Sequence, residues 1–371
     1  MGTEIENLQN ILKEDPSNFQ ARRELSVLLA DNGFNEEALK NLEYLVEYFP
    51  EDADLYYNLG ILYEKTKSPK KAEKSYKKAI SIYPHEDFYY NLGEVLVTLE
   101  KWDEAAEAFK EVIKRDSKDG NSYFNLGLCY LHNENIKLAT DNLQKAVEIN
   151  PKDLYAQFYL GNIYMQNGLT NFAEDCFKKV LEISPDYSWA YYNLASIAYG
   201  NGNNEQAKRY LRKTIQYNDS DIDAYKLLTK LCIKENDIED IITILETRLK
   251  KEENGDLYYI LARVYKYVGN SGDYAKNLQN AIANQLTLTY PKESVLNEYN
   301  NIKSSAGEEL EPEGKIEEYN SETEEDDIFD EEINEELDDE DDLEEVEEED
   351  EDDDEDDDDD DDEDDEGLEE V

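Results

Sequence analysis

Several residue types that build active sites and disulfide frameworks are scarce in this chain. Its 371 residues include only two histidines and three cysteines. His85 and His132 stand far apart, and neither a CxxC nor an HExxH spacing occurs, so we expect no metal site. A Gly-rich phosphate loop is also missing. These absences predict a protein that is not an enzyme and that uses no cofactor.

The cysteines and the apolar runs limit where the protein works. Cys129, Cys176 and Cys232 are odd in number and widely spaced, which favours buried free thiols in a reducing compartment. No apolar run approaches the length of a membrane span, and the first residues lack the pattern of a secretory signal. We therefore expect a cytoplasmic location without membrane contact, and nuclear entry remains open if a partner carries the chain.

Negative charge is abundant and unevenly distributed. The formal net charge is -56, and residues 304–371 hold 45 Asp and Glu residues against a single lysine. Such a segment repels itself and lacks apolar mass, so we expect a disordered acidic tail over 304–371. One alternative stays open, in which Ile328, Phe329, Ile333 and nearby apolar residues form a helix on a partner.

One leucine returns along the rest of the chain at intervals of 33 or 34 residues. These repeat leucines are Leu25, Leu59, Leu92, Leu126, Leu160, Leu194, Leu228 and Leu261. A small residue follows each of them, such as Gly60 or Ala195, and an alanine stands 13 places later in six units. Spacings of three and four within each unit are helical, and Asn-Gly pairs mark a turn between two helices. A period of this length predicts a repeat architecture of helix pairs.

The unit resembles the tetratricopeptide repeat family. Its pattern of aromatic, Leu-Gly, Tyr, Ala, aromatic, Ala and Pro is matched nearly throughout by Tyr56-Leu59-Gly60-Tyr63-Ala72-Tyr76-Ala79-Pro84. The resemblance covers about residues 4–288, and the seventh and eighth units depart most from it. It implies an all-α, right-handed superhelical solenoid of about eight helix-turn-helix units with capping helices, followed by the disordered acidic tail.

The same pattern predicts the organisation of the chain. We expect an N-terminal capping helix within 1–18, a solenoid over 19–288, a C-terminal capping helix over 289–303 and the tail over 304–371. The units are expected to start near residues 19, 53, 86, 120, 154, 188, 222 and 255.

The resemblance also implies that the first helix of each unit lines a concave groove that binds a partner. Two kinds of side chain near the repeat leucines are candidates, aromatic residues two places before and asparagines directly before. The predicted binding residues are Tyr57, Asn58, Tyr90, Asn91, Phe124, Asn125, Phe158, Tyr192 and Asn193. An amide offers both a donor and an acceptor to a peptide backbone, and aromatic rings provide rigid apolar contact. The alternative is that these residues only pack the helices together.

A basic patch is predicted near the end of the solenoid. Its members are Lys226, Lys230, Lys234, Arg263 and Lys266. The patch is similar in kind to the family's carboxylate-binding clamp, although the Lys-and-Asn pattern of that clamp is not reproduced. An ordinary solvated lysine face is the alternative.

Two function classes follow. The first is a non-enzymatic protein–protein interaction scaffold or adaptor that binds a peptide or partner segment in the groove. The second is a chaperone-like holder of basic proteins, of the histone or ribosomal type, that acts through the acidic tail. Direct nucleic-acid binding is disfavoured because the tail carries the same charge as phosphate. The sequence leaves open the partner, the oligomeric state and whether the tail inhibits, chaperones or only solubilises.

Overall fold

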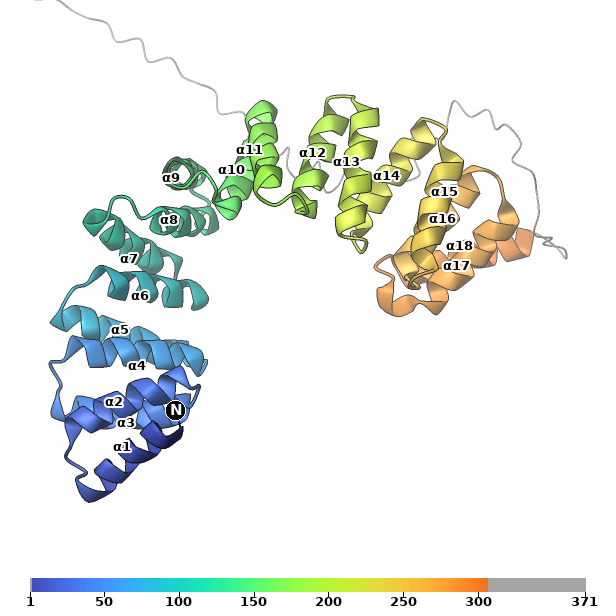
Figure 1. The fold of residues 1–371 in the computed structure, drawn as a ribbon. Coiled ribbons are helices and arrows are strands. Elements are labelled where there is room, and N and C mark those ends of the chain that lie inside the picture. Colours follow the sequence, from blue (N-terminus) through green and yellow to red (C-terminus); the bar gives the residue numbers. More distant parts are fainter. Residues whose placement is uncertain (1, 306–371) are drawn as a thin grey trace, which may run out of the picture. The chain divides into compact units, whose positions relative to one another are not determined.

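The computed structural model describes residues 2–305, and every regular element in that range is a helix (Figure 1). The predicted all-α repeat array is therefore confirmed for this part of the chain. Residues 306–371, which hold nearly all of the predicted acidic tail and its apolar residues, lie outside the described range.

Eight helix pairs follow one another along the chain, each made of a first and a second helix. They are α2 (Phe19–Asp31) with α3 (Asn35–Tyr48), α4 (Ala53–Lys65) with α5 (Pro69–Ile82), α6 (Glu86–Thr98) with α7 (Trp102–Arg115), α8 (Gly120–His132) with α9 (Ile136–Ile149), α10 (Leu154–Gln166) with α11 (Thr170–Ile183), α12 (Ser188–Gly200) with α13 (Asn204–Tyr217), α14 (Ile222–Lys234) with α15 (Ile238–Leu249), and α16 (Gly255–Tyr267) with α17 (Ser271–Ala283).

Single helices flank the pairs. Helix α1 (Gly2–Glu14) precedes them, and a short 3-10 helix η1 (Gln285–Thr287) and helix α18 (Lys292–Ser305) follow them. Helix α18 continues two residues into the segment predicted as tail. Ile302 in its last turn still packs against the buried cluster that includes Leu278 and Val295.

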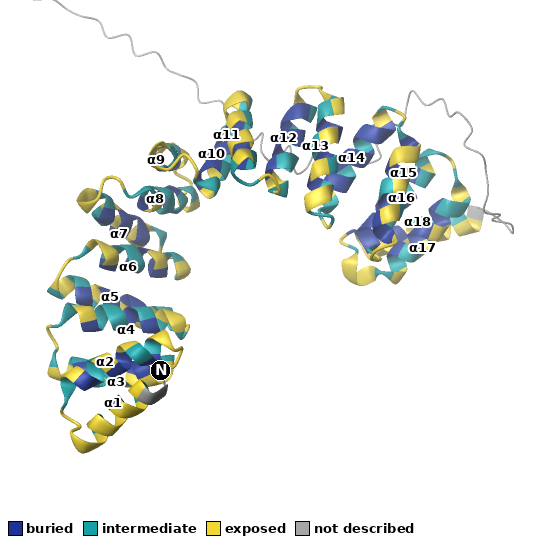
Figure 2. Ribbon diagram, viewed as in Figure 1, coloured by how far each residue is buried: buried dark blue, intermediate teal, exposed yellow. Residues whose placement is uncertain are grey.

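Apolar side chains at fixed places in the unit form the core between the helices. All eight repeat leucines are at most 6% exposed, and the alanines 13 places after six of them are fully buried (Ala38, Ala72, Ala105, Ala139, Ala173, Ala207). Buried residues lie where helices meet, and exposed residues lie along the outer sides and turns (Figure 2). Each unit buries its apolar faces only against its own partner helix and its neighbours, as expected of a repeat protein.

The size of the residue after each repeat leucine is set by the side chain 17 places after that leucine. A Cβ atom built on Gly93 would lie 2.7 Å from the Phe109 ring, and one on Gly161 would lie 2.8 Å from the Phe177 ring. Both distances are too short for carbon atoms. In the three units where this place holds an aromatic ring, the residue after the leucine is always glycine. Of the five units with leucine there, four carry Ser, Ala or Thr, and the fifth carries Gly127, whose Cβ would lie 2.8 Å from Leu143.

The turn inside every unit uses one left-handed residue. Eight places after each repeat leucine the backbone has positive φ, and four of these residues are glycines. The other four are Lys67, Glu100, Glu134 and Asn236, with φ between 54° and 61°. A left-handed residue ends a helix by letting the following N–H groups bond back to its last carbonyls, and Ser68 N–H donates to the Tyr63 carbonyl in this way.

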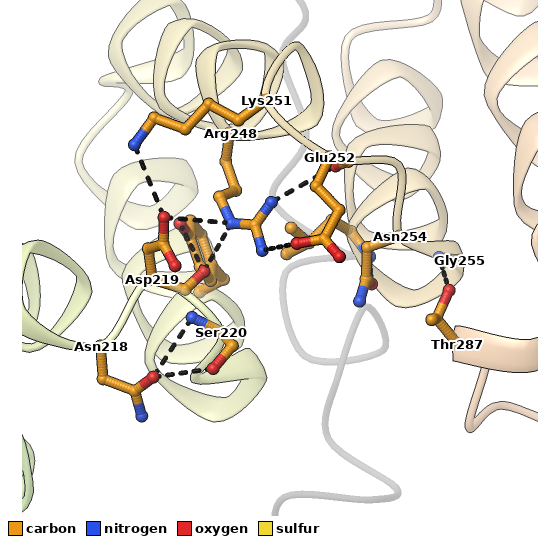
Figure 3. A network of polar contacts seen from close by, with 11 residues as sticks. Asn218, Asp219, Ser220, Arg248, Lys251, Glu252, Asn254, Gly255 and Thr287 are labelled. Atoms are coloured by element: carbon orange, nitrogen blue, oxygen red, sulfur yellow. Dashed lines mark hydrogen bonds and ion pairs between the residues drawn. The ribbon is translucent and has the colours of Figure 1, made fainter.

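The second helix of the seventh unit carries a buried arginine near its end, at a place where several other units carry alanine (Figure 3). Arg248 of α15 is 7% exposed and stands at the place where Ala79, Ala146 and Ala281 stand in other units. Its Nε donates to the Asp219 carbonyl at 2.7 Å, and its Nη2 donates to the Glu252 carboxylate at 3.0 Å. The guanidinium therefore joins the two turns on either side of this unit, which lacks the usual proline.

Charged side chains join the second helix of one unit to the turn of the next. Buried Glu73 accepts hydrogen bonds from Lys77 and Lys101, both at 2.8 Å. Four units later Lys208 takes the place of Glu73, and Asp237 takes the place of Lys101, so the contact recurs with reversed charges.

Lys208 is surrounded by acidic groups. Its side chain is 2% exposed, and its Nζ lies 2.9 Å from Glu205 and 2.5 Å from Asp237, with Glu235 also paired. Burial opposes its charge, but the hydrogen bonds to Asp237, Glu235 and Glu205 outweigh burial and raise the lysine pKa above its usual value. These three carboxylates are close enough together to hold a metal ion, but the ammonium group already occupies the space between them.

The first prediction concerns Gly93. We expect Gly93→Ala to lower the free energy of unfolding by about 1–3 kcal/mol, because the added methyl group overpacks against Phe109. Adding Phe109→Leu should recover part of that loss and give a favourable coupling energy in a double-mutant cycle. Urea unfolding followed by circular dichroism measures both effects.

The control for this prediction is Gly200→Ala. No atom lies within 4 Å of the Cβ position at Gly200, so this helical glycine should accept alanine without loss. Equal destabilisation by the two alanine substitutions would show that the close approach at Gly93 does not limit residue size.

The second prediction concerns Lys208. Lys208→Met keeps the apolar stem but leaves three neighbouring carboxylates without their cation, and we expect it to destabilise the chain by about 1–3 kcal/mol. Arg212→Met is the matched control, because Arg212 pairs with Asp240 at an exposed site where the expected loss is about 0–1 kcal/mol. Thermal unfolding of both variants makes the comparison, and a smaller loss for Lys208→Met than for Arg212→Met would contradict the role of the buried cation.

Candidate functional site

The predicted binding residues lie on five consecutive first helices. Tyr57, Tyr90, Phe124, Phe158 and Tyr192 are half-buried on α4, α6, α8, α10 and α12, each two places before its repeat leucine. We call the side chains at the places one, two and five before the repeat leucines of these helices the first-helix face.

The predicted aromatic residues also pack within and between units. Tyr57 stacks on Phe88 of the next unit with ring centroids 4.6 Å apart, and Tyr90 lies edge-on to Phe109 of its own unit at 5.8 Å. Phe158 contacts Phe177 of its own unit at 5.9 Å. These rings therefore hold neighbouring helices together and leave only part of their surface for a partner.

The asparagines directly before the leucines are tied to the same rings. The Asn91 amide donates to the Tyr57 hydroxyl at 3.1 Å, and the Asn125 amide donates to the Tyr90 hydroxyl at 3.3 Å. Asn193 is buried and donates to Asn162 at 3.1 Å, whereas Asn58 is half-buried on α4. The packing role weighed for these residues is thus present in the structure, and their role in peptide binding stays a prediction.

Tyr57 and Tyr90 remain protonated at neutral pH. Burial and the nearby charge of Asp87 raise the pKa of Tyr57, and the hydrogen bond from Asn91 opposes them. Burial and the charge of Glu94 raise the pKa of Tyr90 to about 12. The hydroxyl groups are therefore neutral, and they lie in a negative electrostatic environment.

The structure adds three exposed aromatic residues that the sequence analysis missed. Tyr155 is 60% exposed, Tyr159 is 36% exposed and Trp189 is 55% exposed. Tyr159 takes the place directly before its repeat leucine that holds asparagine in four other units, and its ring lies 5.9 Å from that of Phe124. The signal was available in the sequence as aromatic residues at places that are polar in other units.

The cations of the predicted basic patch are in part engaged by acidic and aromatic neighbours. Arg263 lies 3.7 Å from Glu298 of α18, and Lys226 lies 3.4 Å from Asp223. Lys266 lies 6.0 Å from the Tyr274 ring centre, Lys230 is half-buried, and Lys234 is exposed at the end of α14. The five residues share one end of the repeat array, but they are not five open cations.

Glu298 is the centre of this arrangement. Its carboxylate accepts a hydrogen bond from Tyr259 at 2.8 Å and another from Tyr274 at 2.5 Å, besides its ion pair with Arg263. Tyr259 stands two places before the repeat leucine of the eighth unit, where five of the earlier units carry the predicted aromatic residues. In this unit Glu298 of the final helix, α18, binds the side chain at that place.

A pocket lies at the other end of the array, between α1 and α2. Its lining includes Glu4, Leu8, Arg23 and Val27. Arg23 stands two places before the first repeat leucine, so the pocket borders the same register as the aromatic residues, although it contains none of the predicted binding residues.

Comparison with solved structures finds similar proteins. A C-terminal part of a TPR repeat-containing protein from Cytophaga hutchinsonii is 18% identical, with 74% of this chain and 98% of that chain covered at a TM-score of 0.51. YrrB, described as a TPR protein with an unusual peptide-binding site, is 29% identical, with 49% of this chain and 95% of that chain covered at a TM-score of 0.45. No curated protein sequence matches the chain.

Family models and helix lengths complete the comparison. Among residues 2–305 no helix combines the length and apolar character that crossing a membrane requires. Tetratricopeptide repeat models match residues 24–87, 90–153 and 170–231, which together make up just over half of the sequence. With the repeat register and the helix pairs described above, these matches show that the chain belongs to the tetratricopeptide repeat family.

Proposed function

We propose that this chain is a non-enzymatic scaffold that binds a segment of a partner protein along the first-helix face. Tetratricopeptide repeats typically serve as interaction scaffolds and bind protein or peptide partners. The observation that carries the proposal is the row of half-buried aromatic rings on the five helices from α4 to α12, joined on all but α10 by an asparagine, in which Asn91 donates to Tyr57 and Asn125 donates to Tyr90.

The physical basis is the fixed register of the units. Because each unit repeats the same helix pair, the same places of successive first helices come side by side, and a partner segment meets a similar set of groups at each step. Rings already held by neighbours lose little conformational freedom on binding, which favours affinity. The basic patch would extend this surface beyond α12.

The location and the alternative function are also proposals. Cys129, Cys176 and Cys232 are buried free thiols, which supports the expected reducing cytoplasmic location. The alternative, a holder of basic proteins, depends on residues 306–371, which lie outside the described range. Its support is the density of Asp and Glu in that segment.

The third prediction separates these functions by partner capture at physiological salt. We expect Asn58→Ala/Asn125→Ala to reduce the affinity for captured partners about 30-fold, because two amides that hydrogen-bond a peptide contribute about 1 kcal/mol each, or about 2 kcal/mol together. Removal of residues 306–371 should leave the same partners bound, and thermal unfolding checks that each variant remains folded.

The matched control places two substitutions on second helices. Asn142→Ala/Asn171→Ala changes α9 and α11 and should leave capture unchanged. Partners that disappear only when residues 306–371 are removed would favour the basic-protein holder. Equal losses from both asparagine pairs would contradict binding on the first-helix face.

A further inference from the structure

The strongest departure from the repeat pattern on the first-helix face is an exposed aromatic patch formed by Tyr155, Tyr159 and Trp189. Five places before the repeat leucine, the other six units carry polar residues (Gln20, Asp54, Asp87, Asn121, Asp223, Asp256). The fifth and sixth of the eight first helices, α10 and α12, carry Tyr155 and Trp189 instead.

These three side chains belong to one surface. Tyr155 and Tyr159 are four residues apart on α10 and therefore lie on the same side of that helix. The Phe158 ring connects them to α12, because its centroid lies 6.2 Å from that of Tyr159 and 5.3 Å from that of Tyr187, the N-cap residue of α12 two places before Trp189. Contiguous exposed apolar surface of this kind marks an interaction site in a soluble protein.

The same face is negatively charged on the N-terminal side of the patch. Asp54 of α4 is exposed, and the Asp87 side chain on α6 is 66% exposed. Within residues 2–305, neither Asp54, Glu64 nor Glu94 forms an ion pair with a lysine or arginine. Burial raises the pKa of Glu64, the hydrogen bond from the Tyr76 hydroxyl lowers it, and the nearby charge of Glu94 raises it.

Tyr57 and Tyr90 stand among these carboxylates. A lysine or arginine side chain that reached this place would meet aromatic rings and acidic groups together, and both attract a cation. A carboxylate-bearing segment would instead be repelled here. Charge complementarity therefore selects one class of partner for the α4–α6 region.

We propose that the bound partner is an extended segment with lysine or arginine residues over α4–α6 and an apolar anchor on Tyr155, Tyr159 and Trp189. This inference rests on the proposed function and specifies its ligand. First helices in direct contact are about 8–10 Å apart, so α6 and α10 are separated by about 20 Å, which about six extended residues span. The cationic and apolar parts of the partner should be separated accordingly.

The test uses the full-length chain with Trp102→Phe, which leaves Trp189 as the single tryptophan. Trp102 is stacked on His132 with ring centroids 3.8 Å apart, so it would otherwise contribute a separate signal. Emission from Trp189 reports binding at the patch.

Three synthetic peptides without Tyr or Trp serve as ligands, each in both sequence orders. The first carries Lys-Arg-Lys, six Gly and Ser residues, and Leu-Phe-Leu. The second replaces the cations by glutamates, and the third replaces Leu-Phe-Leu by serines. At physiological salt we expect the first, in one order, to shift Trp189 emission and bind at least tenfold more tightly than the other two.

Variants assign this binding to the two parts of the site, with affinity measured by calorimetry. Trp189→Ser should weaken the first peptide about tenfold, because a central tryptophan contributes strongly to binding. Asp54→Asn/Asp87→Asn should weaken it about three- to fivefold and leave the glutamate peptide unchanged. Phe172→Ser is the matched control, since Phe172 is 59% exposed on the second helix α11, and it should have no effect.

The outcomes distinguish the ligand from the function. Tight binding of the glutamate peptide, with the same emission shift, would overturn the proposed ligand while leaving the scaffold function intact. Binding that Phe172→Ser weakens as much as Trp189→Ser, or no emission shift with any peptide, would overturn the aromatic patch as the anchor site. The scaffold function fails separately, if partner capture does not respond to the asparagine substitutions on the first-helix face.

Discussion

The close approach of the two helices within each unit is the constraint on which the rest of the structure depends. At Gly93 the Phe109 ring fills the space that any side chain would need, and the buried alanine 13 places after each of six repeat leucines brings the second helix near in the same way. A helix pair packed this closely still has an apolar side with no partner of its own. That side must be covered by the next unit, so the unit is stable only within an array.

This constraint divides the side chains into two groups. Places that face the partner helix accept only a narrow range of sizes, whereas a place on the first-helix face varies from Asp54 to Asn121 to Tyr155. Variation along one side of a fixed scaffold is how a repeat protein acquires a particular ligand without altering its fold. Charge contributes in the same manner between units, since the contact made by Glu73 and Lys101 recurs with opposite signs in Lys208 and Asp237.

Much of the fold could be predicted from the sequence, because the repeat leucines and the residues after them report helix packing directly. The turns were less predictable. Lys67, Glu100 and Glu134 adopt a left-handed backbone that their residue types do not signal, and only comparison with Gly33 and Gly168 at the same place indicates it. Their conformation is fixed by the register of the unit and not by local preference.

The candidate site was predicted only in part, for a physical reason. The sequence places Asn91 and Tyr57 near the same surface, but it does not reveal the hydrogen bond that joins these residues of two neighbouring units. Likewise, nothing local to Arg263 indicates that Glu298, 35 residues later, pairs with it. Contacts between units depend on the stacking of helices, whereas the exposed Tyr155 and Trp189 could have been recognised from their places alone.

Side-chain footprinting by hydroxyl radicals, on the full-length chain with and without its captured partner, tests the central claim most directly. The account predicts that the partner protects Tyr155, Tyr159 and Trp189 on the first helices. Phe172 and Tyr217, which are exposed on second helices, should react equally in both states. Protection of Phe172 and Tyr217 with unchanged reactivity of Trp189 would contradict it.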